Sequence, residues 1–295
     1  MIKLESISKS FGNKIVLDGI TTTFEKGKIY GLLGRNGAGK TTLLRILSNL
    51  ILNYNGTASL NGIEIRENQE MVEKIILVHN KMIPSTFESE SINSIYKWAA
   101  MILPNWDEDY KNKLVQEFGI NLKTKYSKLS EGNKNLVSLI LGLASNAEIV
   151  FFDEPSTGLD ANNRYKFYEI LMKDMEEKER YCIISTHIID EVEKIFERVL
   201  ILDNSHLILE EEISDLQEKA LVIAGDGNIL ADILKDKNII GEQSIGGMKI
   251  FSIYDDLTDD EKMTLKLNNA EIKSIHLQDL FVLLTDKEAQ NEIYK

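Results

Sequence analysis

The chain has 295 residues, 43% of them hydrophobic, which is enough for one large domain and a smaller one. Its formal net charge of −13 at pH 7 argues against sequence-independent binding to nucleic acid, which needs a basic surface. No apolar run approaches the roughly 20 residues that span a bilayer, and the N-terminus lacks a signal-peptide core, so we expect the chain to stay on the cytosolic side.

The N-terminal part of the sequence alternates short apolar runs with turns. Residues 1 to about 30 follow this pattern, which predicts antiparallel strands ahead of a buried strand at 28–33. A helix is expected from Thr41 to Leu50, because leucine and isoleucine recur there at helical spacing. Asn55-Gly56 and Asn61-Gly62 are typical of hairpins, so we expect turns at 54–57 and 60–62.

Residues 34–41, Gly-Arg-Asn-Gly-Ala-Gly-Lys-Thr, form a phosphate-binding pattern that we call the nucleotide loop. Its glycines let successive amide N–H groups point inward at an anion. Lys40 adds a positive charge toward the β- and γ-phosphates, and Thr41 offers a hydroxyl to Mg²⁺. The helix that follows favours the same negative charge at its N-terminus. We expect ATP or GTP to contact Gly34, Asn36, Gly37, Ala38, Gly39, Lys40, Thr41 and Thr42.

The middle of the chain is helical and then returns to strands. From about 86 to 146, apolar residues at helical spacing predict a helical insertion. Buried strands at 149–152 and 181–184, separated by a helix at 161–178, predict a parallel sheet. The single cysteine, Cys182, lies in the second of these strands, where we expect a buried structural thiol.

The C-terminal part of the sequence predicts a separate small domain. Residues 205–218 are acidic and are expected to be helical, and we place a domain boundary near residue 218, giving domains at 1–217 and 218–295. Strands near 220–224, 238–243, 248–254 and 270–275 and helices at 228–236 and 259–268 follow, with a last helix from 277. This order is that of a ferredoxin-like α/β domain.

Further candidate residues follow the predicted strands and open one helix. Asp153 and Glu154 end a hydrophobic strand, at the edge where parallel sheets bind ligands. Asp153 is the candidate magnesium ligand, and Glu154 the candidate group that polarises the attacking water. His187 follows the next strand and is placed to hydrogen-bond the γ-phosphate. Ser130 is a natural N-cap for the helix that runs through residue 143, which is also what a plain capped helix would show.

Together these motifs resemble those of ABC-type ATPases over residues 1 to about 215. The shared features are the nucleotide loop, the signature segment 129–133, Asp153-Glu154, the coupling loop 156–160 and His187. The resemblance implies an α/β fold, a P-loop NTPase of ABC type with an N-terminal antiparallel β subdomain and a helical subdomain at about 86–146. It also implies that Phe11 stacks on adenine, that Ser130 and Gly132 complete a partner subunit's site, and that Asp160 lies in the loop coupling the two sites. Such proteins bind two ATP, with Mg²⁺, between two head-to-tail subunits, and hydrolysis releases them.

The sequence departs from the family pattern at three positions. Glu131 stands where the signature usually has a second glycine, and Asn133 stands for its glutamine. The glutamine expected near residue 80, which links Mg²⁺ and water to the membrane partner, corresponds to Asn80, preceded by His79. A shorter amide still coordinates but reaches less far, so we expect Asn80 to serve catalysis and metal binding with altered coupling to the partner.

The chain is similar to the separate ATPase subunits of bacterial drug and peptide exporters, among them those of staphylococcal phenol-soluble modulin exporters. This resemblance implies an ATPase that powers export of a drug, antimicrobial or amphipathic peptide from the cytoplasmic face of the cell membrane. The implied partners are an integral membrane permease and a second nucleotide-binding subunit, either identical or a close paralogue, with no nucleic acid. Trp98, Met101 and Trp106 either dock on the permease or pack in the core.

Two other classes of ABC protein remain as alternatives. Soluble ABC ATPases of translation, DNA maintenance or cluster assembly work without a permease. The translation type usually carries two nucleotide units, the DNA-maintenance type has long coiled coils, and both prefer basic surfaces, none of which this sequence shows. A regulatory subunit would bind ATP and barely hydrolyse it. Glu154 and His187 argue against this last class.

Overall fold

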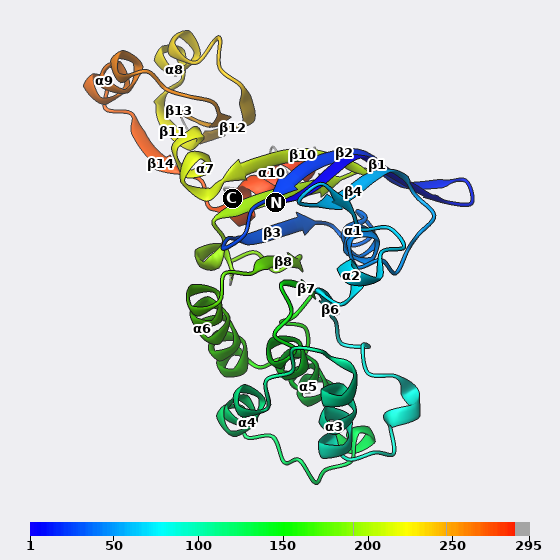
Figure 1. Ribbon diagram of the computed structural model, residues 1–295. Helices are drawn as coiled ribbons and strands as arrows, with labels where there is room; N and C mark the ends of the chain where they lie inside the picture. The colour runs from blue at the N-terminus through cyan, green and yellow to red at the C-terminus, as the bar shows by residue number, and fades with distance from the viewer. Residues whose placement is uncertain (191, 246, 287–295) are drawn as a thin grey trace. The chain divides into compact units, whose positions relative to one another are not determined.

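The structure is a computed structural model that describes residues 1–190, 192–245 and 247–286 (Figure 1). The chain divides into two compact units, one made of Met1–His187 with Lys194–Glu210 and the other of Ile188–Glu193 with Glu211–Lys295. Each unit has a hydrophobic core of its own. In the described part of the chain, no helix has both the length and the apolar content needed to cross a membrane.

The first unit begins with the predicted antiparallel sheet, in the order β2-β1-β4-β5. Its strands are β1 (Ile2–Phe11), β2 (Lys14–Phe24), β4 (Asn55–Leu60) and β5 (Ile63–Glu64). In β1, Ile2, Leu4 and Ile7 are fully buried while their neighbours face solvent, as expected for a sheet that covers a core on one side.

A second sheet in this unit carries the candidate site, in the order β10-β9-β3-β8-β7-β6. Its strands are β3 (Ile29–Gly34), β6 (Ile75–Val78), β7 (Ile149–Asp153), β8 (Tyr181–Thr186), β9 (Arg198–Asp203) and β10 (His206–Glu212). The strands from β9 to β6 pair in parallel, so their carboxyl ends meet at one edge. Every residue of β3 and β8 is buried, which explains why these strands read as continuous apolar runs.

The first unit has one helix between its two sheets and further helices beside the second sheet (Figure 1). Helix α1 (Lys40–Leu47) packs against β2 of one sheet and against β3 and β7 of the other. The helices α2 (Gln69–Val72), α3 (Ile92–Ile102), α4 (Glu108–Glu117), α5 (Glu131–Ala144) and α6 (Ala161–Glu177) follow, with short 3₁₀ turns at Ser85–Phe87, Tyr126–Lys128 and Glu193–Ile195. Residues 135–144 of α5 are all buried, and this helix contacts α3, α4 and β6.

The two tryptophans of the helical insertion pack against aromatic neighbours, whereas its methionine does not. Trp98 lies against Phe87 at a ring-centroid distance of 5.0 Å, and Trp106 lies 6.1 Å from Tyr96. Met101 is 83% exposed at the end of α3. Of the three side chains proposed to meet a permease, only Met101 is therefore fully available on this surface.

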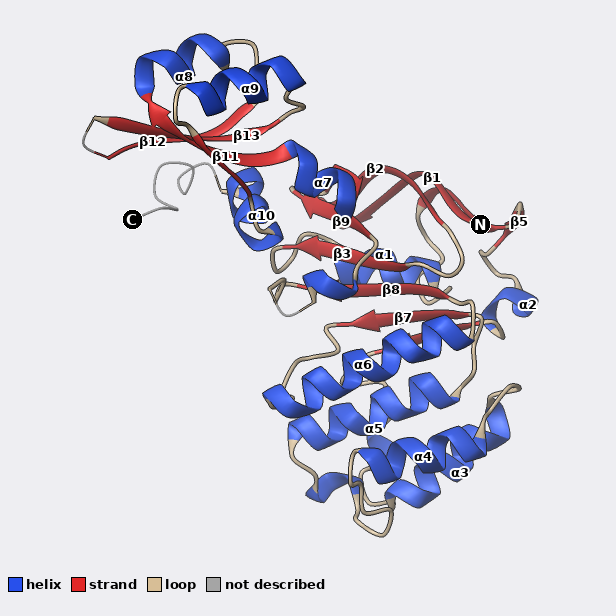
Figure 2. Cartoon of the chain, turned by 90° about the vertical axis from the view of Figure 1, so that its left-hand side faces the viewer, coloured by secondary structure: helices blue, strands red, loops and turns tan. Residues whose placement is uncertain are grey.

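The second unit is a small sheet with helices, in the order β12-β13-β11-β14. Its elements are α7 (Ile213–Lys219), β11 (Ala220–Asp226), α8 (Gly227–Ile233), β12 (Ile239–Ile245), β13 (Met248–Tyr254), α9 (Asp259–Leu267), β14 (Glu271–Ser274) and α10 (Leu277–Thr285). Helices α8 and α9 cover one face of the sheet (Figure 2), and their leucines join Ile223, Phe251 and Ile253 in its core. This is the predicted ferredoxin-like order.

Three local predictions were wrong. Residues 55–57 do not form a hairpin turn; they begin β4 and pair with β1, with Ser8 opposite Asn55 and Glu5 opposite Thr57. Residues 206–212 form strand β10 and not a helix, because β9 offers a pairing partner that outweighs the helix propensity of three glutamates. Helix α1 ends at Leu47, before Asn49 takes a left-handed conformation with φ of 57°.

Candidate functional site

The nucleotide loop joins β3 to α1 at the carboxyl edge of the parallel sheet. Lys40 is the first residue of α1 and is 5% exposed. Its ammonium group folds back over the loop and donates to the carbonyl oxygens of Gly34 at 2.6 Å and Arg35 at 3.4 Å. Burial lowers the pKa of Lys40, while the nearby Glu154 carboxylate opposes that shift. The loop therefore holds one buried cation next to a set of backbone amides.

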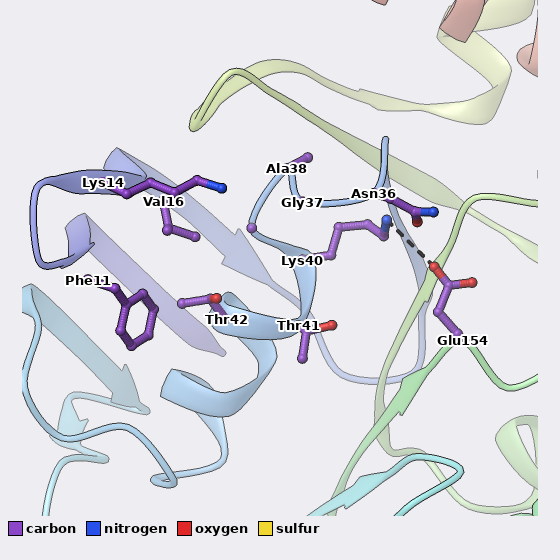
Figure 3. Close-up of a pocket in the computed structure, with 11 residues that line it drawn as sticks. Phe11, Lys14, Val16, Asn36, Gly37, Ala38, Lys40, Thr41, Thr42 and Glu154 are labelled. Atoms are coloured by element: carbon purple, nitrogen blue, oxygen red, sulfur yellow. Dashed lines mark ion pairs between the residues drawn. The ribbon is translucent and has the colours of Figure 1, made fainter.

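A cleft of about 420 Å³ lies beside the loop (Figure 3). It is lined by Phe11, Lys14, Val16, Asn36, Gly37, Ala38, Gly39, Lys40, Thr41, Thr42 and Glu154. Eight of these residues were expected to contact the nucleotide, namely Phe11 and the seven from Asn36 to Thr42. The cleft thus collects the loop, the start of α1 and one acid from the end of β7 around a single space.

Asp153, the last residue of β7, accepts hydrogen bonds from side chains of α1 and β8. Its Oδ2 accepts a hydrogen bond from Thr41 Oγ1 at 2.8 Å, and its Oδ1 accepts one from Ser185 Oγ in β8. The hydroxyl and the carboxylate proposed as magnesium ligands are therefore side by side. Sequence reasoning missed Ser185, whose small side chain at the end of a strand gives no signal of its own.

Glu154 has a left-handed backbone, with φ of 54°, which is uncommon for a residue other than glycine. Its amide donates to the carbonyl oxygen of Ser185 at 3.0 Å, and this turn directs its side chain away from the strand. Oε1 then lies 3.6 Å from Lys40 Nζ, and Oε2 lies 2.8 Å from His187 Nδ1. The carboxylate, which lines the cleft, is held between two basic side chains.

An aromatic ring and a lysine form the opposite wall of the cleft. Phe11 ends β1 and is 52% exposed, with Lys9 Nζ 4.8 Å from its ring centroid. Lys14 opens β2 directly opposite Phe11 in the sheet, and it extends toward the nucleotide loop (Figure 3). Sequence reasoning missed Lys14, because nothing in the local pattern of an exposed strand residue indicates that it borders a cleft.

Asn80 and His79 follow β6, on the strand next to β7. Asn80 is exposed, whereas His79 is partly buried. Burial lowers the pKa of His79, and the Asp153 carboxylate opposes this shift. The parallel pairing of Val78 with Phe152 places His79 level with Asp153 in the sheet.

Ser130, Gly132 and Asp160 are not among the described residues that line the cleft of their own chain. Ser130 caps α5 and accepts a hydrogen bond from the amide of Asn133 at 3.3 Å. Asp160 caps α6 in the same way, accepting from the amide of Asn163 at 2.8 Å. The N-cap at Ser130 was predicted from the sequence, whereas the N-cap at Asp160 was not.

Comparison with known proteins identifies the family. The model of the ABC transporter family matches residues 17–157. The ABC transporter ATP-binding protein YtrB of Bacillus subtilis is 31% identical over 225 residues, which are 76% of each chain. The chain belongs to the ABC transporter ATP-binding family.

Other members of this family extend the likeness. The bacitracin transport ATP-binding protein BcrA of Enterococcus faecalis is 28% identical over 244 residues, covering 80% of this chain and 78% of its own. The solved structure of an ATP-binding subunit of an ABC transporter has the same fold, with a TM-score of 0.65 over 73% of this chain and 91% of that one, at 22% identity. This ABC subunit is therefore an ATPase whose activity is coupled to transport.

Proposed function

We propose that residues at the carboxyl edge of the parallel sheet bind and hydrolyse ATP, each with a distinct role. Lys40 and the amides of the nucleotide loop bind the phosphates, Glu154 orients the attacking water, and His187 hydrogen-bonds the γ-phosphate. The observation that carries this proposal is the Glu154 carboxylate, placed between Lys40 Nζ and His187 Nδ1. A base held in this way is aligned before substrate arrives, and so little reorganisation is needed during the reaction.

The donor set at Asp153 fits a magnesium ion. Mg²⁺ prefers oxygen ligands at about 2.0–2.1 Å in an octahedron, which puts adjacent ligands roughly 2.9 Å apart. Thr41 Oγ1 and Asp153 Oδ2 are 2.8 Å apart. When bound, the ion would neutralise charge on the phosphates.

Phe11 and Lys14 are assigned to the base and ribose-phosphate end of the nucleotide. The exposed face of Phe11 offers a stacking surface for adenine, and Lys9 Nζ lies over the ring. Lys14 brings a second cation to a cleft that has to accept the several negative charges of a triphosphate. Its exposure limits this contribution to a modest gain in affinity.

The second half of each ATP site is assigned to a partner subunit. Ser130, Gly132 and Asp160 are absent from the cleft of their own chain, within the described residues, yet Ser130 and Asp160 open helices whose N-termini favour anions. In this proposal two subunits associate head to tail, so that the signature segment of each closes the cleft of the other. ATP then holds the dimer closed, and hydrolysis opens it.

We further propose that the subunit works on the cytoplasmic face of the cell membrane and powers export of a drug, antimicrobial or amphipathic peptide through a separate permease. The likeness to the bacitracin transport subunit supports this cargo class. Exposed Met101 and Ile102 at the end of α3 supply an apolar surface for the permease. The likeness to phenol-soluble modulin exporters stays a prediction within the same class.

An efflux measurement tests this assignment. Cells that produce the subunit with its permease are loaded with a fluorescent amphipathic peptide, and retention is compared with cells carrying Glu154→Gln. We expect the wild-type pair to lower the retained peptide and Glu154→Gln to abolish the effect. Equal retention in both strains, or greater uptake with the wild-type pair, would contradict export of this cargo class.

A further inference from the structure

A buried asparagine ties the helix of the signature segment to the segment that follows Glu154. Asn135 lies in the second turn of α5 and is 1% exposed. Its Nδ2 donates to the carbonyl oxygen of Pro155 at 2.6 Å and to that of Thr157 at 2.9 Å. Both amide hydrogens are thus used on one short piece of chain, which begins directly after Glu154.

The backbones of the same two segments also touch. A Cβ added to Gly132 would lie 2.4 Å from the carbonyl oxygen of Gly158, so no side chain fits there without moving one segment. Gly158 has φ of 78°, a conformation that a non-glycine residue adopts only with strain. This close approach lies one turn of α5 before Asn135, so the two segments meet at two successive points.

We propose that Asn135 is a positioning residue that clamps the coupling loop to α5, so that Glu154 and Ser130 of one subunit move together. This inference rests on the proposed function, in which Glu154 serves the subunit's own ATP and Ser130 serves the partner's. The clamp then transmits the presence of the partner's nucleotide at Ser130 to the water-orienting carboxylate. An asparagine suits the task because its NH₂ group supplies two donors to two carbonyls, whereas an aspartate would place a negative charge against both.

The test compares Asn135→Asp with a control at the other end of the same helix. Ser145 is also buried and donates from Oγ to the carbonyl oxygen of Gly142 at 2.6 Å, far along α5 from the coupling loop. Ser145 Oγ also accepts from the amide of Ala147 at 3.3 Å, so Ser145→Ala removes two buried hydrogen bonds without touching the clamp. For both variants, the melting temperature and the Kd for a fluorescent ATP analogue are measured on the isolated subunit, where binding is not coupled to closure on the permease. The kcat for ATP is measured with the permease present.

We expect Asn135→Asp to lower kcat by about 10- to 100-fold, the usual penalty for displacing a catalytic group by an ångström or less. The Kd of the analogue should stay within about 2-fold, because the cleft residues are not touched. Ser145→Ala should lower the melting temperature and leave kcat near the wild-type value. If the two variants lower kcat in parallel with the melting temperature, or if Asn135→Asp keeps the wild-type kcat, the clamp is only structural and the inference is wrong.

A second arm separates this inference from the function on which it rests. Glu154→Gln alone should form a dimer with ATP, and Asn135→Asp added to it should weaken that dimer by about 10-fold or more. Failure of Glu154→Gln itself to dimerise would count against the proposed composite site. The role of Asn135 would then be decided by whether Asn135→Asp lowers kcat while leaving the Kd of the analogue unchanged. An unweakened double variant would count against the clamp and leave the composite site standing.

Discussion

Thr41 Oγ1 donates a 2.8 Å hydrogen bond to Asp153 Oδ2, although 112 residues separate the two in sequence. The fold therefore brings together the two residues that we propose hold Mg²⁺. Thr41 lies there because α1 starts at the loop, and Asp153 because β7 is near β3 in the parallel sheet, with only β8 between them.

Replacing Thr41 by valine removes the hydroxyl and keeps the branched shape. We expect the Mg²⁺ concentration for half-maximal ATPase activity to rise by about 10-fold or more, the usual cost of altering the surroundings of a bound metal. A magnesium titration of the ATPase rate measures this. Thr57→Val is the control, because Thr57 Oγ1 also donates a hydrogen bond to a carboxylate, that of Glu5, but at an exposed position of the antiparallel sheet. An unchanged magnesium curve for Thr41→Val would remove Thr41 from the metal site.

Replacing Lys14 by alanine should raise the KM for ATP by about 2- to 5-fold, corresponding to an exposed charge contact of up to about 1 kcal/mol. The kcat should change little, because Lys14 is on the wall of the cleft opposite Glu154 (Figure 3). Initial rates over a range of ATP concentrations decide it, with Lys266→Ala on exposed α9 as the control. If kcat falls and KM stays, Lys14 acts on the reaction and not on binding.

Replacing His187 by alanine removes one of the two basic neighbours of Glu154. We expect kcat to fall by about 100-fold, as for the loss of a single group that stabilises a transition state, while the Kd for ATP changes far less. Single-turnover hydrolysis and analogue binding separate the two quantities. His276→Ala, in the C-terminal unit, provides a matched histidine loss. A wild-type single-turnover rate for His187→Ala would exclude its contact with the γ-phosphate.

Replacing Asn80 by glutamine restores the longer amide that the family resemblance implies. We expect the ATPase rate to change more in the presence of the permease than in its absence, because this position links the metal site to the membrane partner. Rates measured in both settings test the prediction. Equal rates for wild type and variant in both would show that the shorter amide does not alter coupling.

Local motifs were predictable because their chemistry lies within a few consecutive residues. The nucleotide loop from Gly34 to Thr41 is one turn between a strand and a helix, and its order of glycines, lysine and threonine is enough to define it. The N-cap at Ser130 is equally local, since the side chain accepts from an amide three residues on. For such features, sequence and structure carry the same information.

Features that depend on distant partners were not predictable from one sequence. Lys14 borders the cleft only because β2 pairs with β1, and Asn135 reaches Pro155 only because the fold brings α5 next to the segment that follows β7. The three glutamates at 210–212 favour a helix locally, yet they form a strand in which Glu210 pairs with Arg198 at 3.1 Å. In each case a long-range contact decides what the local pattern leaves open.

The most direct test of the central proposal is the mass of Glu154→Gln in solution with ATP and Mg²⁺. Glutamine keeps the size of the side chain but removes the charge that orients water between Lys40 and His187. We expect hydrolysis to fall by at least about 100-fold and light scattering to give twice the 33.5 kDa of one chain. A variant that stays monomeric with ATP and hydrolyses it at the wild-type rate would contradict the proposed ATP-closed dimer.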